Sequence, residues 1–329
     1  MKNASDGQPP IEPATEIRVG ISSCLLGDEV RFDGGHKRDR FITDTLSQFV
    51  TFVPVCPEME IGLGSPRESM HLAKVDGEIR LVTTKTHEDL TDRMAGYART
   101  RVAQIEQMKL CGFILKKDSP SCGMERVKVY GPLRTAPAKT GRGLFAAELI
   151  ARHSDLPIEE EGRLCDPRLR DNFFVRLFAY RRLRFLFDTE WKLGDLVAFH
   201  TAEKLLIRAH DPVVYRKLGR LVAVAGQMPR EEVEKAYRHD FSSALRKLAT
   251  TRKVTDVLQH TIGHLRKHID DASRHELLGL FEDFRGGLVP LVVPLTLLRH
   301  HLRHHQISYL QGQTFLEPHP KELMLRNHV

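Results

Sequence analysis

Hydrophobic and polar positions follow two different patterns along the chain, and the change falls near its middle. In the first half, short apolar runs at 17–21, 49–55 and 112–115 alternate with stretches of helical spacing. Short apolar runs that alternate with helices are typical of a parallel α/β sheet. The first half is therefore expected to be an α/β domain with a mainly parallel sheet.

The clearest helix of this half is expected over residues 88–108. Thr86 followed by Asp89 offers a capping-box start. Apolar residues then recur at steps of three and four, which predicts that one face of the helix packs on the sheet. These residues are Met94, Ala98, Val102, Ile105 and Met108.

From Arg168 onward the apolar residues keep helical spacing almost without interruption, which predicts an all-α helical bundle. Trp191 and His200 are expected to pack inside this bundle. The expected organisation is a flexible tail at 1–16, the α/β domain at 17–155, a polar linker at 156–169 and the helical domain at 170–329.

Length and composition favour an ordinary globular protein. The chain has 329 residues with 41% hydrophobic content, enough for two domains with sizeable cores. No stretch approaches about 18 uninterrupted apolar residues, and the polar start lacks the order of a secretory signal. We expect a cytoplasmic protein without a membrane partner.

Charge is distributed unevenly between the two halves. Residues 1–165 carry 23 Lys and Arg against 24 Asp and Glu, whereas residues 166–329 carry 27 against 19. The second half therefore holds the whole positive excess, which indicates that its partner is a polyanion and favours nucleic acid.

Three of the five cysteines follow predicted strands, each beside a Gly or a Pro. In a parallel sheet Cys24, Cys56 and Cys122 emerge at the same carboxyl edge, where open α/β sheets bind ligands. Three thiolates describe a metal site with one coordination position left open. Their wide spacing favours an iron-sulfur cluster over zinc, and three unrelated buried thiols are the alternative. Cys111 is expected in the core and Cys165 in the linker.

The segments around these cysteines resemble the motifs of the thiouracil desulfidase family. The resemblance covers about residues 18–153 and implies that Cys24, Cys56 and Cys122 hold a 4Fe-4S cluster whose fourth iron binds the sulfur of a thiolated uracil. The matching segments are Ser22-Ser23-Cys24-Leu25-Leu26-Gly27, Arg31-Phe32-Asp33-Gly34-Gly35, Val55-Cys56-Pro57-Glu58 and Ser119-Pro120-Ser121-Cys122-Gly123.

Five residues near the cysteines are candidates for catalysis and substrate binding. Glu58, two residues after a candidate ligand, is the expected acid/base, with a helix cap as the alternative. Ser119, with Asp118 and Ser121 beside it, is expected to donate hydrogen bonds to the pyrimidine or to the tetrahedral intermediate. The serines are alternatively only turn formers. Asp33 is a further substrate-binding candidate, or part of a tight turn alone.

The second half resembles a helical domain of unknown function that is often fused to a desulfidase module. The resemblance spans about residues 170–327 and extends to bacterial desulfidases that act on 4-thiouridine in tRNA. It implies that the chain converts this base to uridine and sulfide by hydrolysis. The expected RNA-binding residues are Lys204, Arg208, Arg216, Lys217 and Arg220.

Other interpretations remain open at the level of the sequence. His300/His304 and His301/His305 have the i,i+4 spacing of metal ligands, but a solvated face or an RNA-facing helix fits them better. One rival function is desulfuration of free thiouracil or a thiolated nucleoside. Another is a non-catalytic iron-sulfur sensor in which Cys111 or Cys165 supplies a fourth thiolate.

Overall fold

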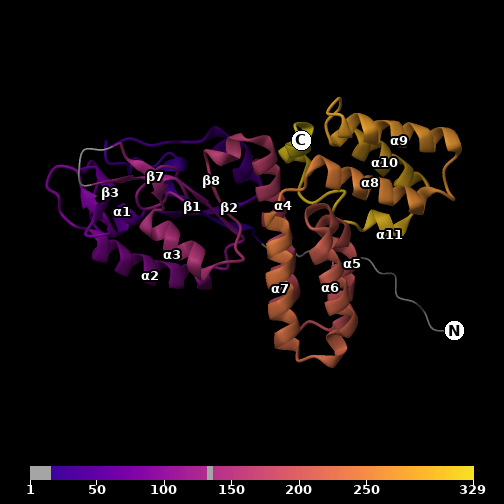
Figure 1. Cartoon of the computed structure of the whole chain (residues 1–329), viewed down its shortest axis with the longest axis horizontal. Helices are drawn as coiled ribbons and strands as arrows, with labels where there is room; N and C mark the ends of the chain where they lie inside the picture. Colours follow the sequence, from indigo (N-terminus) through magenta and orange to yellow (C-terminus); the bar gives the residue numbers. More distant parts are fainter. Residues whose placement is uncertain (1–15, 132–135) are drawn as a thin grey trace. The chain divides into compact units, whose positions relative to one another are not determined.

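The structure, a computed structural model, describes residues 16–131 and 136–329, and these residues form two compact units (Figure 1). An α/β unit ends at Cys165, and a helical unit begins at Asp166. The expected tail at 1–16 lies outside the described residues except for Glu16. The predicted fold class, an α/β domain followed by an all-α domain, is confirmed.

A parallel sheet forms the centre of the α/β unit. Its strand order is β2-β1-β5-β8, and every neighbouring pair is parallel. At the middle of the sheet a side chain on Gly20 would clash with the ring of Phe113 on the neighbouring strand, so only glycine fits there. The strands are β1 (Arg18–Ser22), β2 (Thr51–Val55), β5 (Gly112–Leu115) and β8 (Ile158–Glu160).

A second sheet, which the hydrophobic pattern did not predict, covers a core of its own. Its order is β4-β3-β6-β7, with β3 and β6 parallel and the outer pairs antiparallel. Leu72, Leu81 and Val129 are buried beneath it. The strands are β3 (Met70–Val75), β4 (Glu78–Thr83), β6 (Val127–Tyr130) and β7 (Ala138–Gly141).

The predicted helix at 88–108 appears as α2 (Thr91–Gln107), which packs beside α3 (Leu144–Arg152). Met94, Ala98, Val102 and Ile105 form its buried face, as expected. The predicted capping box is wrong, because the N-cap residue is Leu90, whose side chain makes no capping hydrogen bond; Asp89 Oδ1 instead accepts the N–H of Thr91, the first residue of the helix, at 2.9 Å. The Thr86 hydroxyl instead hydrogen-bonds Thr83 Oγ1 at 2.7 Å.

Residues 156–169 differ from the expected linker. Ile158–Glu160 is a buried edge strand paired with β5, and the short turn η4 (Arg163–Cys165) follows it. Three consecutive glutamates suggested an exposed segment, but each carboxylate has a partner inside the unit, so the strand tolerates them.

The helical unit consists of helices and the turns that join them. Asp166, Asp211, Thr250 and Asp270 cap four of the helices with their side chains. The helices are α4 (Pro167–Phe187), α5 (Leu193–His210), α6 (Pro212–Val224), α7 (Arg230–Arg246), α8 (Thr251–Leu265), α9 (Asp271–Arg285), α10 (Val292–His304) and α11 (Ser308–Gln311).

Aromatic side chains fill much of the core of this unit. Tyr237 is fully buried, and its hydroxyl lies 3.0 Å from Nδ1 of His200. Trp191 packs edge-on against Phe187. The expectation that Trp191 and His200 lie in the core is confirmed.

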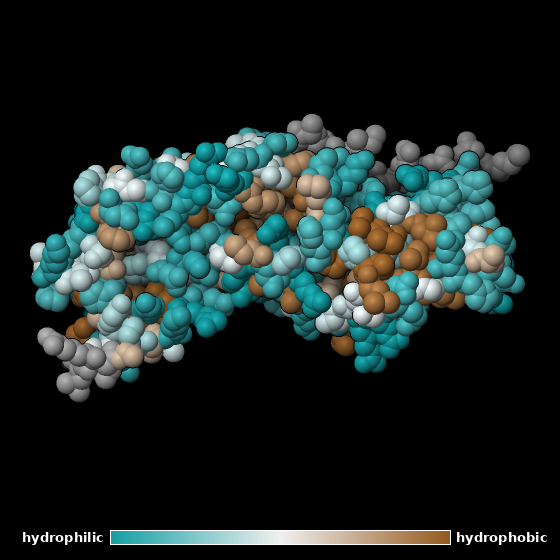
Figure 2. Space-filling model, turned by 90° about the horizontal axis from the view of Figure 1, so that it is seen from above, coloured by the Kyte–Doolittle hydropathy of each residue, from teal (hydrophilic) through white to brown (hydrophobic). Residues whose placement is uncertain are grey.

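The exterior is mostly hydrophilic on the face that Figure 2 shows, and a hydrophobic patch lies on the helical unit. Leu288 and Val213 of this unit are among the most exposed large apolar residues, at 77% and 65%. Within the described residues, no helix combines the length and apolar character needed to cross a membrane.

Candidate functional site

The three candidate cysteines come together at the carboxyl edge of the parallel sheet. Cys24 lies in the turn η1 (Ser23–Leu25) directly after β1, and Cys56 follows β2 and precedes the short helix α1 (Pro57–Glu60). Cys122 lies in the loop after β5. All three line one cavity of about 440 Å³. The parallel pairing of β1 with β2 and β5 is what brings them to this edge.

Burial controls the protonation of these thiols. Desolvation raises the pKa of Cys24 to about 11, against a lowering effect of Lys116. Desolvation and then Glu58 raise the pKa of Cys56 to about 12 and that of Cys122 well above its usual range. A bound metal reverses this preference, because a coordinating thiol loses its proton.

The donor set fits an iron-sulfur cluster. Sulfur donors from three separate loops surround a cavity that is open enough for a group of several atoms. Soft thiolates are the donors that iron-sulfur clusters use. In residues 16–131 and 136–329, no three His, Cys, Asp or Glu side chains are arranged to hold a single metal ion.

A buried chain of hydrogen bonds joins the Cys56 and Cys122 loops. Glu58 is 9% exposed, and its Oε2 lies 3.5 Å from Cys56 Sγ. The fully buried Ser121 hydroxyl donates to Glu58 Oε1 and lies 3.0 Å from Ser119 Oγ. This contact places a carboxylate and two hydroxyls beside the three thiols.

Glu58 and Ser119 make different local contacts. The carboxylate of Glu60, rather than that of Glu58, accepts the N–H of Cys56 at 3.2 Å, so Glu58 remains available to the cavity. Ser119 Oγ accepts the N–H groups of Ser121 and Cys122 at 3.3 and 3.0 Å. Ser119 therefore shapes the Cys122 loop while it lines the cavity.

The two candidate aspartates lie in different places. Asp118 lines the cavity and has a left-handed backbone, with φ of 59°. Asp33 is not among the lining residues. Its carboxylate accepts the N–H of Gly35 at 3.2 Å and pairs with Arg31 at 3.3 Å. These contacts lower the pKa of Asp33, Gly35 first. They form the tight turn that was the alternative interpretation of Asp33, and the neighbouring Arg31 lines the cavity.

Basic side chains also line the cavity, and none of them was among the predicted site residues. They come from the loop after η1, from the segment before β3 and from the end of β5, so the cavity is cationic as well as sulfur-lined. The signal for two of them was present, because Lys116 and Lys117 directly follow β5. The basic residues are Arg31, Lys37, Arg67, Lys116 and Lys117.

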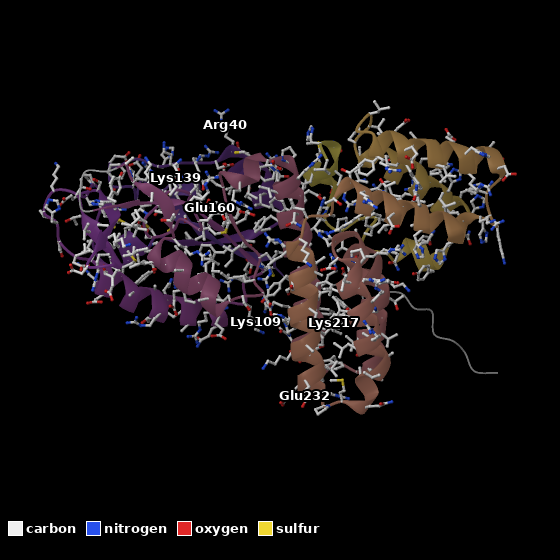
Figure 3. The ribbon with its side chains drawn as sticks, in the orientation of Figure 1. Arg40, Lys109, Lys139, Glu160, Lys217 and Glu232 are labelled. Carbon is white, nitrogen blue, oxygen red and sulfur yellow. The ribbon has the colours of Figure 1, made fainter. Side chains whose placement is uncertain are left out.

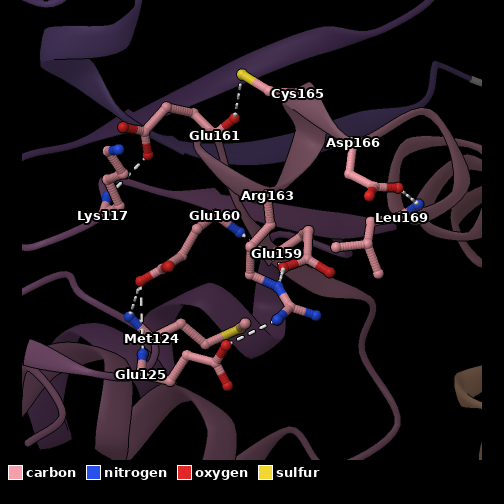
Figure 4. A network of polar contacts seen from close by, with 10 residues as sticks. All are labelled: Lys117, Met124, Glu125, Glu159, Glu160, Glu161, Arg163, Cys165, Asp166 and Leu169. Carbon is pink, nitrogen blue, oxygen red and sulfur yellow. Dashed lines mark hydrogen bonds and ion pairs between the residues drawn. The ribbon is translucent and has the colours of Figure 1, made fainter. Parts of the chain in front are cut away.

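Carboxylates at the end of β8 hold both ends of the Cys122 loop (Figure 4). Glu161 pairs with Lys116 Nζ and accepts the N–H of Lys117 at 2.7 Å. Glu160 accepts the N–H of Met124 at 2.6 Å. Burial raises the pKa of Glu160 despite this bond. The strand misread as a linker thus fixes the loop that carries Cys122.

The other two cysteines lie away from this cavity. Cys111 is buried at the start of β5, as expected, and is not among the lining residues. Cys165 is exposed, and its Sγ lies 3.8 Å from the carbonyl of Glu161. Neither thiol is among the residues that line the cavity.

The five predicted RNA-binding residues differ in how much charge they present. Arg208 pairs with Asp256 at 3.0 Å. Lys217, which is labelled in Figure 3, pairs with Asp240 at 2.8 Å. Lys204 Nζ lies 4.6 Å from the centre of the Tyr309 ring. Arg216 and Arg220 on α6 are exposed. Unlike Arg208 and Lys217, these two arginines form no ion pair within the described residues.

The histidines at the end of α10 stack on one another. The rings of His300 and His304 lie 6.3 Å apart, and those of His301 and His305 lie 6.2 Å apart. They belong to no metal-binding group of the described residues.

The fold and the site together define an α/β protein with three thiols and a carboxylate at a sheet edge, joined to a helical unit. The 2-thiouracil desulfurase family model matches residues 19–161, and the model of a protein family of unknown function, DUF1722, matches residues 204–320. The α/β unit therefore contains a domain of the 2-thiouracil desulfurase family, which the chain joins to a C-terminal helical domain.

Two curated proteins and one solved structure are each similar to part of this chain. The uncharacterized protein YbgA of Escherichia coli (strain K12) is 33% identical over 161 residues, which is 49% of this chain and 95% of YbgA. The uncharacterized protein YbbK of Bacillus subtilis (strain 168) is 33% identical over 135 residues, 39% of this chain and 87% of YbbK. A solved structure of the 4Fe-4S-dependent thiouracil desulfidase TudS is 28% identical and covers 46% of this chain and 94% of TudS, with a TM-score of 0.38.

Proposed function

We propose that this chain removes sulfur from 4-thiouridine in tRNA, giving uridine and sulfide, with a 4Fe-4S cluster held by Cys24, Cys56 and Cys122. The observation that carries the proposal is the meeting of these three thiols with the Glu58–Ser121 pair at one cavity. Five free cysteines suit a reducing cytoplasm, where we place the protein.

The cluster, when bound, supplies an open iron that attracts soft sulfur and makes the carbon of a thiocarbonyl electrophilic. Glu58 takes a proton from the attacking water and returns it to the pyrimidine nitrogen or the departing sulfur. Ser121 holds the Glu58 carboxylate in place for both transfers. The carbon gains the water oxygen and loses sulfide, so no electron donor is required.

The other lining residues bind and orient the substrate. Ser119 and Asp118 lie at the cavity, within the loop that precedes Cys122, and contact the edge of the pyrimidine. A well-placed donor to the developing oxyanion contributes about 3 kcal/mol. Arg31, Lys37 and Lys117 receive the phosphate of the nucleotide.

The tRNA substrate is inferred from the helical unit. Residues 166–329 carry the whole positive excess of the chain, and Arg216 and Arg220 expose their charge on α6. A thiolated base must leave its stack to reach the cavity, at a cost of a few kcal/mol. Contacts between this unit and the RNA backbone offset that cost.

The experiment that tests the proposed ligands compares cysteine variants. Wild type, Cys56→Ser, Cys111→Ser and Cys165→Ser are reconstituted anaerobically with iron and sulfide, and iron per chain and turnover of thiolated tRNA are measured. Cys56→Ser is expected to lose iron and turnover, whereas the other two keep both. Loss of the cluster in Cys111→Ser or Cys165→Ser, with normal folding, would favour the four-ligand sensor.

A second candidate function is desulfuration of free thiouracil. The family model that matches residues 19–161 is described by this base. The cavity of about 440 Å³ also accommodates a lone pyrimidine. In that case the helical unit serves another purpose, and turnover is insensitive to phosphate contacts.

A further inference from the structure

The helical unit has a cavity of its own, with a volume of about 300 Å³. It is formed by α4, α5, α8 and the C-terminal residues, and it shares no lining residue with the cysteine cavity. Its volume is at the lower end of those of small-molecule sites. Apolar and polar side chains both line it; the apolar ones include Leu206, Leu248, Phe284 and Phe315.

A buried guanidinium distinguishes this cavity from a packing defect. The side chain of Arg326 is 10% exposed, and its Nη1 donates to the carbonyl of Phe315 at 2.7 Å. Its Nε has no hydrogen-bond partner among the described residues. The nearest carboxylate oxygen, Asp171 Oδ1, is 4.0 Å away and lies 2.9 Å from Nε2 of His319.

An incompletely paired buried cation is costly in the free protein. Its partner is therefore expected to be a ligand that brings a hydrogen-bond acceptor or a negative charge. Asn172 and His210 line the same cavity and add polar atoms to it.

Two exposed arginines also line the cavity. Arg168 and Arg252 form no side-chain ion pair or hydrogen bond within the described ranges. Arg252 is also the second residue of α8, whose first N–H groups have no acceptor in the helix. Thr250 Oγ1 accepts only the N–H of Lys253, at 3.4 Å. A helix N-terminus flanked by free guanidinium groups favours a phosphate.

The basic side chains that line this cavity outnumber the acidic ones, so the net charge of its lining is positive. Arg168, Arg252 and Arg326 face one carboxylate side chain, Asp171, and the terminal residue Val329, whose carbonyl oxygen accepts the N–H of Leu291 at 2.7 Å. A ligand that carries a phosphate is thus compatible with the charge of the site.

We propose that this cavity binds one nucleotide. The phosphate lies at Arg168, Arg252 and the α8 N-terminus, and the base enters the apolar part and meets Arg326. Aromatic and aliphatic walls with polar atoms suit a planar, hydrogen-bonding base better than an aliphatic chain. The nucleotide is either free or part of an RNA strand. The proposal does not depend on desulfuration, since it concerns a separate cavity.

The test uses the full chain and two probes, with binding rather than turnover as the readout. Uridine monophosphate is titrated by calorimetry, and a fluorescein-labelled oligouridine is titrated by anisotropy. Wild type is compared with the double variant Arg168→Gln/Arg252→Gln, and with Arg266→Gln as a control at the opposite end of α8. All three positions are exposed, so folding is expected to persist, and thermal melting checks it.

The expected result is saturable binding that weakens at least about tenfold in the double variant and less than about twofold in the control. Saturation by both probes indicates a site for free nucleotides. Saturation by the oligonucleotide alone, with the same loss in the double variant, assigns the nucleotide to RNA. The proposal is overturned if neither probe saturates the wild type, or if the double variant binds both probes as the wild type does.

Discussion

Glu58 is the residue on which the proposed chemistry depends most. Its carboxylate is almost fully buried, yet its hydrogen bonds are to side chains of the site, Ser121 and Cys56, rather than to a cation that would neutralise it. The hydrogen bond that the Ser121 hydroxyl donates fixes the orientation of this buried carboxylate. Ser121 is therefore the positioning residue for Glu58.

Ser121→Ala removes that donor without changing the backbone. We expect turnover to fall by about 10- to 100-fold, because the carboxylate loses its orientation, while iron content stays at the wild-type level. The measurement is turnover per bound cluster. Ser47→Ala is the control, since Ser47 is exposed and its hydroxyl bonds only to the carbonyl of Thr43. Equal turnover in both variants would contradict the role of Ser121.

At this scale the sequence predicted residues whose position follows from strand topology and missed those set by local contacts. Cys24, Cys56 and Cys122 were predictable because each follows a parallel strand. Asp33 was not, because its hydrogen bond to the Gly35 N–H forms a turn that sequence spacing does not distinguish from a binding loop.

At the level of elements, strand β8 holds the loop that carries Cys122 and does not serve as a linker between the two units. Its glutamates and the residue after them reach the two ends of the Cys122 loop, through Glu160 to Met124 and through Glu161 to Lys117. Periodicity did not reveal this strand, because three consecutive charged residues hide the two-residue alternation. The second sheet escaped prediction for a similar reason, since its strands are short and only partly buried.

Glu160→Ala is expected to destabilise the α/β unit by about 1–3 kcal/mol, because two half-buried N–H groups lose their acceptor. Urea unfolding followed by circular dichroism measures this change. Glu78→Ala is the matched control, as it removes only an exposed ion pair with Arg80 and is expected to cost less than about 1 kcal/mol. A smaller effect for Glu160→Ala than for the control would show that β8 does not hold the loop.

The whole molecule should lose stability as pH falls. Burial is the main cause that lowers the pKa of His200 and of His210 to about 4, from the ordinary 6.5. Between pH 6.5 and 4 the unfolded chain binds these protons and the folded chain does not, so stability decreases toward acid. Each histidine contributes a slope of up to about 1.4 kcal/mol per pH unit.

Urea midpoints of the helical unit at several pH values test this dependence. His200→Gln is expected to reduce the slope, whereas His239→Gln, at an exposed position, leaves it unchanged. Stability that stays constant from pH 6.5 to 4.5 would contradict the assignment of both histidines as neutral in the folded state.

Salt distinguishes the two candidate substrates, since it acts on the molecule as a whole. Turnover on thiolated tRNA below saturation is expected to fall by at least about tenfold between 50 and 200 mM salt, because phosphate contacts release counterions. Turnover on free thiouracil should change little. Arg216→Gln/Arg220→Gln is expected to flatten the dependence for tRNA alone. Equal salt dependence for the two substrates would contradict an RNA-binding role of the helical unit.

The most direct test of the account is an anaerobic assay on bulk tRNA that contains 4-thiouridine. Cluster-loaded wild type and Cys122→Ala are incubated with it, and the near-ultraviolet absorbance of the thiolated base is followed. We predict loss of this absorbance with the wild type only, accompanied by release of sulfide. An unchanged band in the presence of a formed cluster would contradict tRNA desulfuration and leave free thiolated pyrimidines as the substrate.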